Sequence, residues 1–186
     1  MILLLALAAG LLVGLAWARW RGSPYQAPEL NHLWLVFVAF LPQFIVIYLP
    51  NTRFHFPDSL VAVCLLTSQT LLLGFAWLNR RTMGMPILIF GILLNLTVMA
   101  SNNGFMPISP QTASRLVSKD QLLDIEPGSR IGPKDILLHP RDTRFEWLAD
   151  RFLPPIRFPY QVAFSLGDVF IAIGAFSLLA KPGSST

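Results

Sequence analysis

The chain has 186 residues, of which 54% are hydrophobic and 13% are charged, and its mean hydropathy is +0.57. A soluble domain of this size usually carries about 25% charged residues, so the composition favours an integral membrane protein. The formal net charge is +4, but the basic residues form short clusters at the ends of apolar runs and no continuous stripe. That distribution is typical of membrane proteins and argues against nucleic acid as a partner.

Residues that usually bind metals or cofactors are few and unfavourably spaced. The single cysteine, Cys64, excludes an intrachain disulfide and a cysteine metal site. The three histidines are scattered among predicted loops without ligand spacing, and the sequence contains no glycine-rich phosphate loop. We therefore expect no metal and no cofactor.

Five apolar runs predict five membrane-spanning helices, because a helix needs about 20 apolar residues to cross a bilayer. Basic residues follow the first run and none precedes it, which is the reverse of the order in a signal peptide, so we predict a retained helix. The predicted fold is an all-α, polytopic membrane protein with one domain over residues 1–186. Its spans cover residues 1–18, 33–49, 60–78, 86–100 and 159–180.

The basic loops orient these spans, because short loops rich in lysine and arginine lie on the cytoplasmic side. The loops after the first, third and fifth runs share one side, and all three are basic. We therefore predict a multi-pass protein of the inner (cytoplasmic) membrane, surrounded by lipids, with its N-terminus outside and its C-terminus in the cytoplasm. The basic residues concerned are Arg19, Arg21, Arg80, Arg81 and Lys181.

The polar segment, residues 102–158, is then extracytoplasmic and is predicted to contain short interfacial helices. Ser109 followed by Pro110 is typical of an N-cap with proline in the first helical turn, and it predicts a helix that extends to about Lys119. Residues 136–138 either form a short strand or cover the mouth of the helix bundle.

A second helix is predicted near the end of the polar segment. Thr143 and Glu146 have the spacing of a capping box, which predicts a helix that begins there and ends at about Phe152. Phe145, Leu148 and Phe152 lie on one face, with Trp147 nearby, so the helix is expected to lie on the bilayer surface.

Each of the second to fifth spans contains one strongly polar residue: Gln43, Gln69, Asn95 and Asp168. Such residues are unfavourable against lipid, so we expect them to face one another. Two interpretations follow. The residues form either a polar seam that fixes helix packing or the lining of a path for a substrate or a proton.

Asp168 also allows two interpretations, because the start of its helix is uncertain. If the helix begins at Pro159, the carboxylate lies well inside an apolar span and needs a partner. If the helix begins near Ser165, Asp168 lies in the first turn, where unpaired backbone N–H groups favour a carboxylate. In either case we predict an outward-facing polar pocket formed by Asn102, Asn103, Gly104, Arg151, Ser165, Gly167 and Asp168.

Three motifs in this order resemble a family of bacterial integral membrane proteins that is catalogued only as a domain of unknown function. They are Asn-Gly-Phe-Met-Pro-Ile at 103–108, Leu-Ala-Asp-Arg-Phe at 148–152 and Phe-Ser-Leu-Gly-Asp-Val-Phe at 164–170. The resemblance covers nearly the whole chain. It implies the membrane architecture but no activity.

A second set of residues is similar to lipoprotein signal peptidase, a membrane aspartyl protease. Asn102-Asn103-Gly104, Asp150-Arg151 and the Phe-Ser-Leu-Gly-Asp motif that ends at Asp168 appear in the order of that family's motifs. The late motif lacks its asparagine, and the predicted chain has five spans where that family has four. This resemblance implies Asp168 and Asp150 as candidate catalytic residues that share a proton across a water.

Two classes of function therefore remain open. The first is a non-enzymatic membrane protein: a scaffold, an accessory subunit that binds other membrane subunits, or a small-ligand binder with an outward-facing polar pocket. The alternative is an intramembrane aspartyl-type hydrolase that uses Asp168 with Asp150. The first is preferred, because no catalytic constellation is complete in the sequence.

Overall fold

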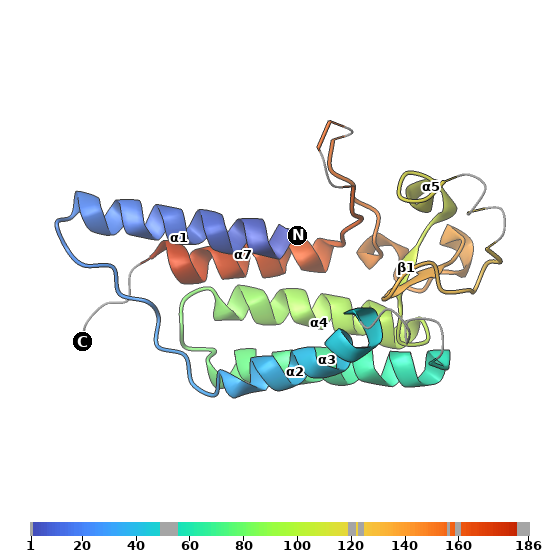
Figure 1. Cartoon of the computed structure of the whole chain (residues 1–186), viewed down its shortest axis with the longest axis horizontal. Helices are drawn as coiled ribbons and strands as arrows, with labels where there is room; N and C mark the ends of the chain where they lie inside the picture. The colour runs from blue at the N-terminus through green and yellow to red at the C-terminus, as the bar shows by residue number, and fades with distance from the viewer. Residues whose placement is uncertain are drawn as a thin grey trace.

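The computed structural model describes residues 2–48, 56–118, 122, 125–155, 157–158 and 161–181. Most of these residues are helical, and five long helices lie side by side along the molecule (Figure 1). This arrangement confirms a mainly helical chain. The helices are α1 (Ile2–Trp20), α2 (Trp34–Tyr48), α3 (Asp58–Leu78), α4 (Met85–Ser101) and α7 (Leu166–Ala180).

The polar segment forms a small cap at one end of these helices, and it is not all-α as predicted. Strand β1 (Met106–Ile108) pairs in parallel with β2 (Asp135–Leu137). The pairing makes residues 136–138 mostly strand, the first of the two predicted alternatives. The other elements of the cap are α5 (Pro110–Ala113) and the 3-10 turns η1 (Pro140–Asp142) and η2 (Glu146–Leu148).

The long helices pack in the order α1, α7, α4, α3, α2, so that α7 lies between α1 and α4. Glycines permit the close approach, as they do in many membrane helix pairs. A Cβ atom added to Gly10 of α1 would lie 2.7 Å from the Phe176 carbonyl oxygen of α7. One added to Gly91 of α4 would lie 2.6 Å from the Gly167 carbonyl oxygen. Larger residues would separate α7 from both neighbours.

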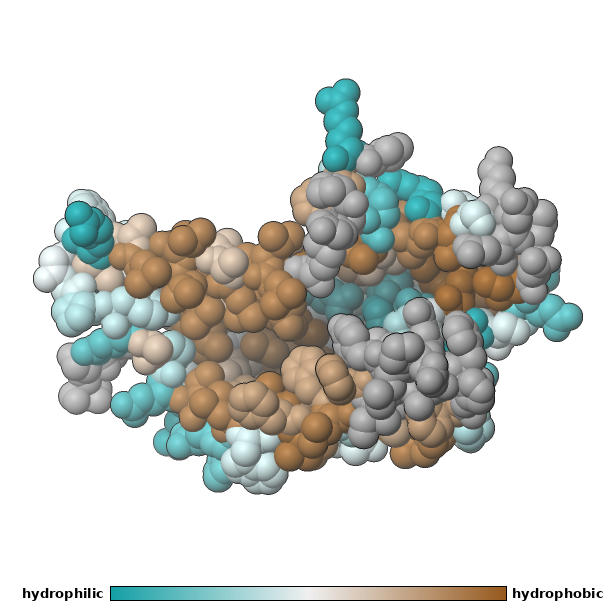
Figure 2. Space-filling view, viewed as in Figure 1, coloured by the Kyte–Doolittle hydropathy of each residue, from teal (hydrophilic) through white to brown (hydrophobic). Residues whose placement is uncertain are grey.

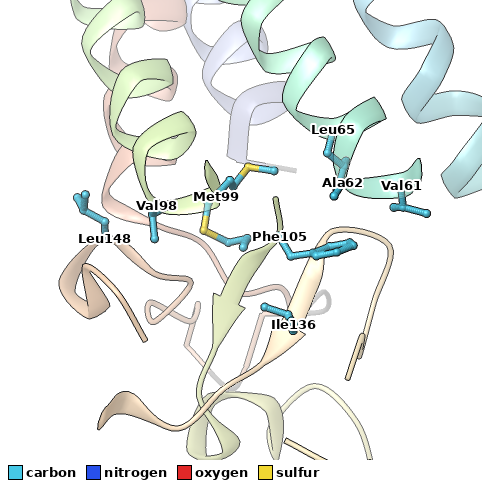
Figure 3. Close-up of a cluster of buried hydrophobic side chains, with 9 residues drawn as sticks. Val61, Ala62, Leu65, Val98, Met99, Phe105, Ile136 and Leu148 are labelled. Atoms are coloured by element: carbon cyan, nitrogen blue, oxygen red, sulfur yellow. The ribbon is translucent and has the colours of Figure 1, made fainter. Parts of the chain in front are cut away.

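A buried apolar cluster attaches the cap to the bundle. Figure 3 shows side chains from α3 and α4 converging on Phe105 and on Ile136 of β2. Apolar burial of this kind is worth about 25 cal/mol per Å², so it fixes the position of the polar segment over the ends of the helices. The cluster contains Val61, Ala62, Leu65, Val98, Met99, Phe105, Met106, Ile136 and Leu148.

In the described part of the chain, two helices are long and apolar enough to cross a membrane, α1 and α3. The other three long helices are apolar but shorter. The predicted fifth span is the clearest difference, because α7 begins at Leu166 rather than at 159. Residues 161–164 are not helical, and 159–160 lie outside the described residues.

The second predicted interfacial helix, from Thr143 to Phe152, is wrong. Only the 3-10 turn η2 forms there, and the residue before it, Phe145, has a left-handed backbone with φ 55°. The Thr143 hydroxyl donates to the His139 carbonyl at 2.9 Å instead of capping a helix. Thr143 and Glu146 have the spacing of a capping box, but the Thr143 hydroxyl forms its hydrogen bond within a local turn, so it caps no helix.

The helix predicted after Ser109 begins where predicted and is shorter than predicted. Ser109 is the N-cap, and its hydroxyl accepts a hydrogen bond from the Thr112 backbone N–H at 3.2 Å. The α-helix ends at Ala113 and turns follow it, whereas the predicted end, Lys119, lies outside the described residues.

Candidate binding site

Asp168 lies in the first turn of α7 and forms a capping box with Ser165. The Asp168 backbone N–H donates to the Ser165 Oγ at 3.0 Å, and the Ser165 N–H donates to the Asp168 Oδ2 at 3.1 Å. These bonds satisfy N–H groups that the start of a helix leaves unpaired. The structure thus selects the second interpretation of Asp168: it is a capping residue at the helix start.

Asn95 of α4 connects this cap to the neighbouring helix. Its Nδ2 donates to the Asp168 Oδ1 at 2.8 Å, and its Oδ1 accepts from the Ser165 hydroxyl at 2.8 Å. Ser165 and Asn95 are both buried. Because the three side chains satisfy one another, the network holds α4 and α7 in one register.

A second polar cluster combines the ammonium group of Lys134 with two carboxyl groups. The Lys134 Nζ lies 2.6 Å from the Asp150 Oδ2 and 3.8 Å from the Asp135 Oδ1. Strand β1 brings these residues together: β2 pairs along one edge, and the Asp150 N–H donates to the Pro107 carbonyl at 3.1 Å on the other. Asp150 is only 1% exposed, so the adjacent cation compensates the burial of its charge.

The surroundings of this cluster shift all three pKa values. Burial raises the pKa of Asp150 to about 7, although Lys134 acts to lower it. Burial also raises the pKa of Asp135, although Lys134 acts to lower it. Burial acts to lower the pKa of Lys134, whereas the nearby carboxylates of Asp150, Asp135 and Asp168 act to raise it. The effect of the carboxylates is larger, so the pKa of Lys134 lies above its usual value of 10.5.

Lys134 of the second cluster lines a cavity together with Asn95 and Asp168 of the first. The cavity has a volume of about 540 Å³, and all five long helices contribute to its wall. Gln43 and Gln69 also line it, while most of the remaining lining is apolar. Figure 2 shows a hollow between α1 and α7 on one side and α2 and α3 on the other, with hydrophobic walls and a hydrophilic end next to the cap. The four polar residues predicted to face one another therefore share one cavity.

The predicted polar pocket divides in the structure. Asp168 lines the cavity, whereas Ser165 and Gly167 lie beside it at the start of α7 and do not line it, and Asn102 binds backbone. Its Nδ2 donates to the carbonyls of Val98 at 2.7 Å and Arg144 at 2.9 Å, and its Oδ1 accepts from the Arg144 N–H at 3.0 Å. Asn102 therefore joins the end of α4 to the turn before η2.

Asn103, Gly104 and Arg151 do not line the cavity either. Asn103 and Gly104 form the turn after α4, with φ values of 55° and 84°. The positive φ and the contact of Gly104 with Ala62 explain the glycine. Arg151 is exposed and pairs with Glu146 at 3.3 Å.

Lys134 and Asp135 were not predicted as site residues from the sequence. They lie in a turn-rich stretch, where adjacent charges usually indicate a solvated loop, so their sequence context gives no signal. The available signal was the apolar run after them, which predicted a possible strand and thus a fixed position for the preceding charges.

The candidate catalytic pair, Asp150 and Asp168, belongs to separate hydrogen-bond networks. Asp150 binds Lys134, and Asp168 binds Ser165 and Asn95. Both carboxylates nevertheless act on the same ammonium group, since each raises the pKa of Lys134.

A family described as "Family of unknown function (DUF5317)" matches residues 28–180. The chain belongs to this family. The match confirms the resemblance to a domain of unknown function, and it contains α2, α3, α4, α7 and the cap, whereas α1 lies before it. Neither the curated proteins nor the solved structures include a significant match.

Proposed function

We propose that this member of the DUF5317 family is a multi-pass membrane protein that binds an amphipathic small molecule in its central cavity. The observation that carries the proposal is the cavity itself. It is about 540 Å³ in volume, apolar along most of its wall, and polar where Lys134, Asn95 and Asp168 line it. Ligand sites commonly have volumes of about 300–1,000 Å³ and a few polar groups that orient the ligand.

The exposed surface supports a membrane location with all five long helices in the bilayer. Large apolar side chains are exposed on the outer faces of several helices, including Leu4 (69%), Leu12 (67%) and Phe37 (72%). Soluble monomers rarely expose continuous apolar patches of this extent. The shorter helices are compatible with this arrangement if the bilayer thins locally beside them.

Aromatic and basic residues at one end of the bundle support the proposed orientation. The Arg21 guanidinium lies 4.8 Å from the ring centre of Trp17, and that of Arg80 lies 5.1 Å from Trp77. Tryptophan favours the membrane interface, and clustered arginine favours the cytoplasmic side. The cap lies at the opposite end (Figure 1), so we propose that it faces outward from the inner membrane, with the N-terminus on the same side.

The form of the hollow suggests how a ligand enters. α1 and α2 are the two ends of the packed row of helices, and both contribute residues to the cavity wall. The hollow in Figure 2 opens between them. In a bilayer this opening faces the acyl chains, so an amphipathic molecule reaches the cavity laterally and its polar head meets the polar end.

The proposal is tested by native mass spectrometry of the protein purified from its membranes. We expect a bound small amphiphile. Leu72→Trp, which fills the cavity from α3, should remove it, whereas Val63→Trp, on the exposed face of the same helix, should retain it. Equal occupancy in both variants would contradict the proposal. Co-purification of a protein and no small molecule would favour the accessory-subunit interpretation.

The aspartyl hydrolase is the second candidate, and one observation favours it: Asp168 lines the cavity together with Lys134, which is paired with Asp150 at 2.6 Å. A hydrolase of this kind would cleave a lipoprotein precursor, and Asp168→Asn would abolish cleavage in a folded protein. Product detection by mass spectrometry decides the question. No cleavage by the wild-type protein would contradict this candidate.

A further inference from the structure

The polar end of the cavity has a carboxylate, that of Asp168, which forms no ion pair with a described residue. Asp168 keeps both carboxylate oxygens in hydrogen bonds from Asn95 and Ser165, but no lysine, arginine or histidine in the described residues lies within 4 Å of it. The Lys134 ammonium is already occupied, at 2.6 Å from Asp150. The charge of Asp168 at the cavity wall is therefore not compensated by an ion pair.

Carboxyl groups outnumber ammonium groups among the described residues around the cavity end. The ammonium group of Lys134 is near three carboxyl groups, those of Asp135, Asp150 and Asp168. The Lys134 ammonium is paired with Asp150 at 2.6 Å, and it lies farther than 4 Å from Asp168. A cationic head group would therefore form the ion pair that Asp168 lacks among the described residues, whereas an anionic head group would meet its carboxylate.

An unpaired acceptor lies in the same cavity wall. The Oε1 atom of Gln69 is buried and has no hydrogen-bond partner among the described residues, although Gln69 lines the cavity. A buried acceptor without a donor has lost its hydrogen bonds to water and destabilises the folded protein. A ligand that supplies N–H donors removes this destabilisation, and a ligand that has only acceptors does not.

From these contacts we infer that the ligand of the cavity is a lipid-like amine, with its protonated amino group at Asp168 and Gln69 and its alkyl chain along the apolar wall. The inference rests on the proposed binding function and specifies its ligand class. An ammonium group has three donors and one positive charge, which matches a carboxylate without an ion pair and an unpaired amide oxygen. Charge-assisted bonds in a site of low dielectric are stronger than neutral ones, so the head group determines selectivity.

The test compares three probes of equal chain length: dodecylamine, dodecanol and dodecanoate. Binding to the full-length protein in nanodiscs of zwitterionic lipid is measured by thermophoresis. The Leu72→Trp variant measures partition into the lipid, because its cavity is filled. After this background is subtracted, we expect dodecylamine to bind at least about tenfold more tightly than dodecanoate, with dodecanol between them.

Two variants assign the head group to its residues. Asp168→Asn removes the charge and should reduce the preference for the amine over the alcohol. Because Asp168 also caps α7, this variant can lose stability, so Gln69→Leu is the second test. It removes an acceptor that has no partner in the part of the chain that the structure describes, so the fold should be retained while affinity for dodecylamine falls several-fold. Val63→Leu, on the exposed face of α3, should leave affinity unchanged.

The outcomes separate this inference from the proposed function. Tighter binding of dodecanoate or dodecanol, with loss in Leu72→Trp, would overturn the amine assignment and leave the cavity as a binding site. Unchanged amine preference in both Asp168→Asn and Gln69→Leu would also overturn it. If no probe binds above the Leu72→Trp background, the proposed binding function fails as well.

Discussion

The Ser165 backbone N–H donates to the Asp168 Oδ2 at 3.1 Å, while the Asp168 N–H donates to the Ser165 Oγ at 3.0 Å. This reciprocal pair fixes where α7 begins, and it aims the Asp168 carboxylate at Asn95 and the cavity. The same hydroxyl also donates to Asn95. A local helix signal therefore positions a charged group of the candidate binding site.

We predict that Ser165→Ala destabilises the protein by about 0.5–2 kcal/mol, because it removes the cap of α7 and a partner of Asn95. The measurement is thermal unfolding in detergent. Ser177→Ala is the matched control on the same helix, since the Ser177 hydroxyl bonds only the preceding turn, at the Ile173 carbonyl. Equal stability of the two variants would show that the cap contributes little.

We expect Gly91→Ala to destabilise the contact between α4 and α7. A Cβ there would lie 2.6 Å from the Gly167 carbonyl oxygen, so the helices must separate and the cavity end must distort. Gly74→Ala is the control, because nothing lies within 4 Å of that position. It should be neutral or stabilising by up to about 1 kcal/mol through helix propensity. Unfolding midpoints of the two variants that coincide would contradict the prediction.

Lys134→Met should destabilise the fold by about 3 kcal/mol, because it leaves the carboxylate of Asp150 buried and unpaired. Arg151→Met removes an exposed ion pair with Glu146 and should cost no more than about 1 kcal/mol. The comparison uses denaturant or thermal unfolding of both variants. If Lys134→Met changes the free energy of unfolding only slightly, water solvates the Asp150 carboxylate in place of the ammonium group, and the prediction is wrong.

The free energy of unfolding should decrease as the pH rises from about 4 to about 7. Burial raises the pKa of Asp150 from 3.8 to about 7 and also raises that of Asp135. In this range the folded state keeps a proton that the unfolded state releases, so stability falls with rising pH.

Lys134 acts in a different range. Its raised pKa contributes stability that is present below 10.5 and is lost at higher pH. Unfolding midpoints across the acidic range test the prediction for the carboxyl pair, and Asp150→Asn should flatten the profile. A midpoint that rises between about pH 4 and 7 in the wild-type protein would contradict it.

Much of the architecture was predictable from the order of apolar and polar residues. Each predicted span corresponds to a long helix, since an apolar run of this length has few stable alternatives to a helix. The Ser109 cap and the strand at 136–138 were also accessible, because their signals are local. The boundary of α7 was left open because both Pro159 and Ser165 can start a helix.

By itself, the sequence determined that the chain is mainly helical, that its family is one of unknown function, and that one polar residue lies in each of four apolar runs. Only the tertiary structure decided which charges meet. Lys134, Asp135 and Asp150 are brought together by the two edges of β1, a pairing between segments whose spacing gives no periodic signal. A sequence does not show which charged loop residues form ion pairs. Their interaction depends on the distances between them, and the packed fold sets those distances.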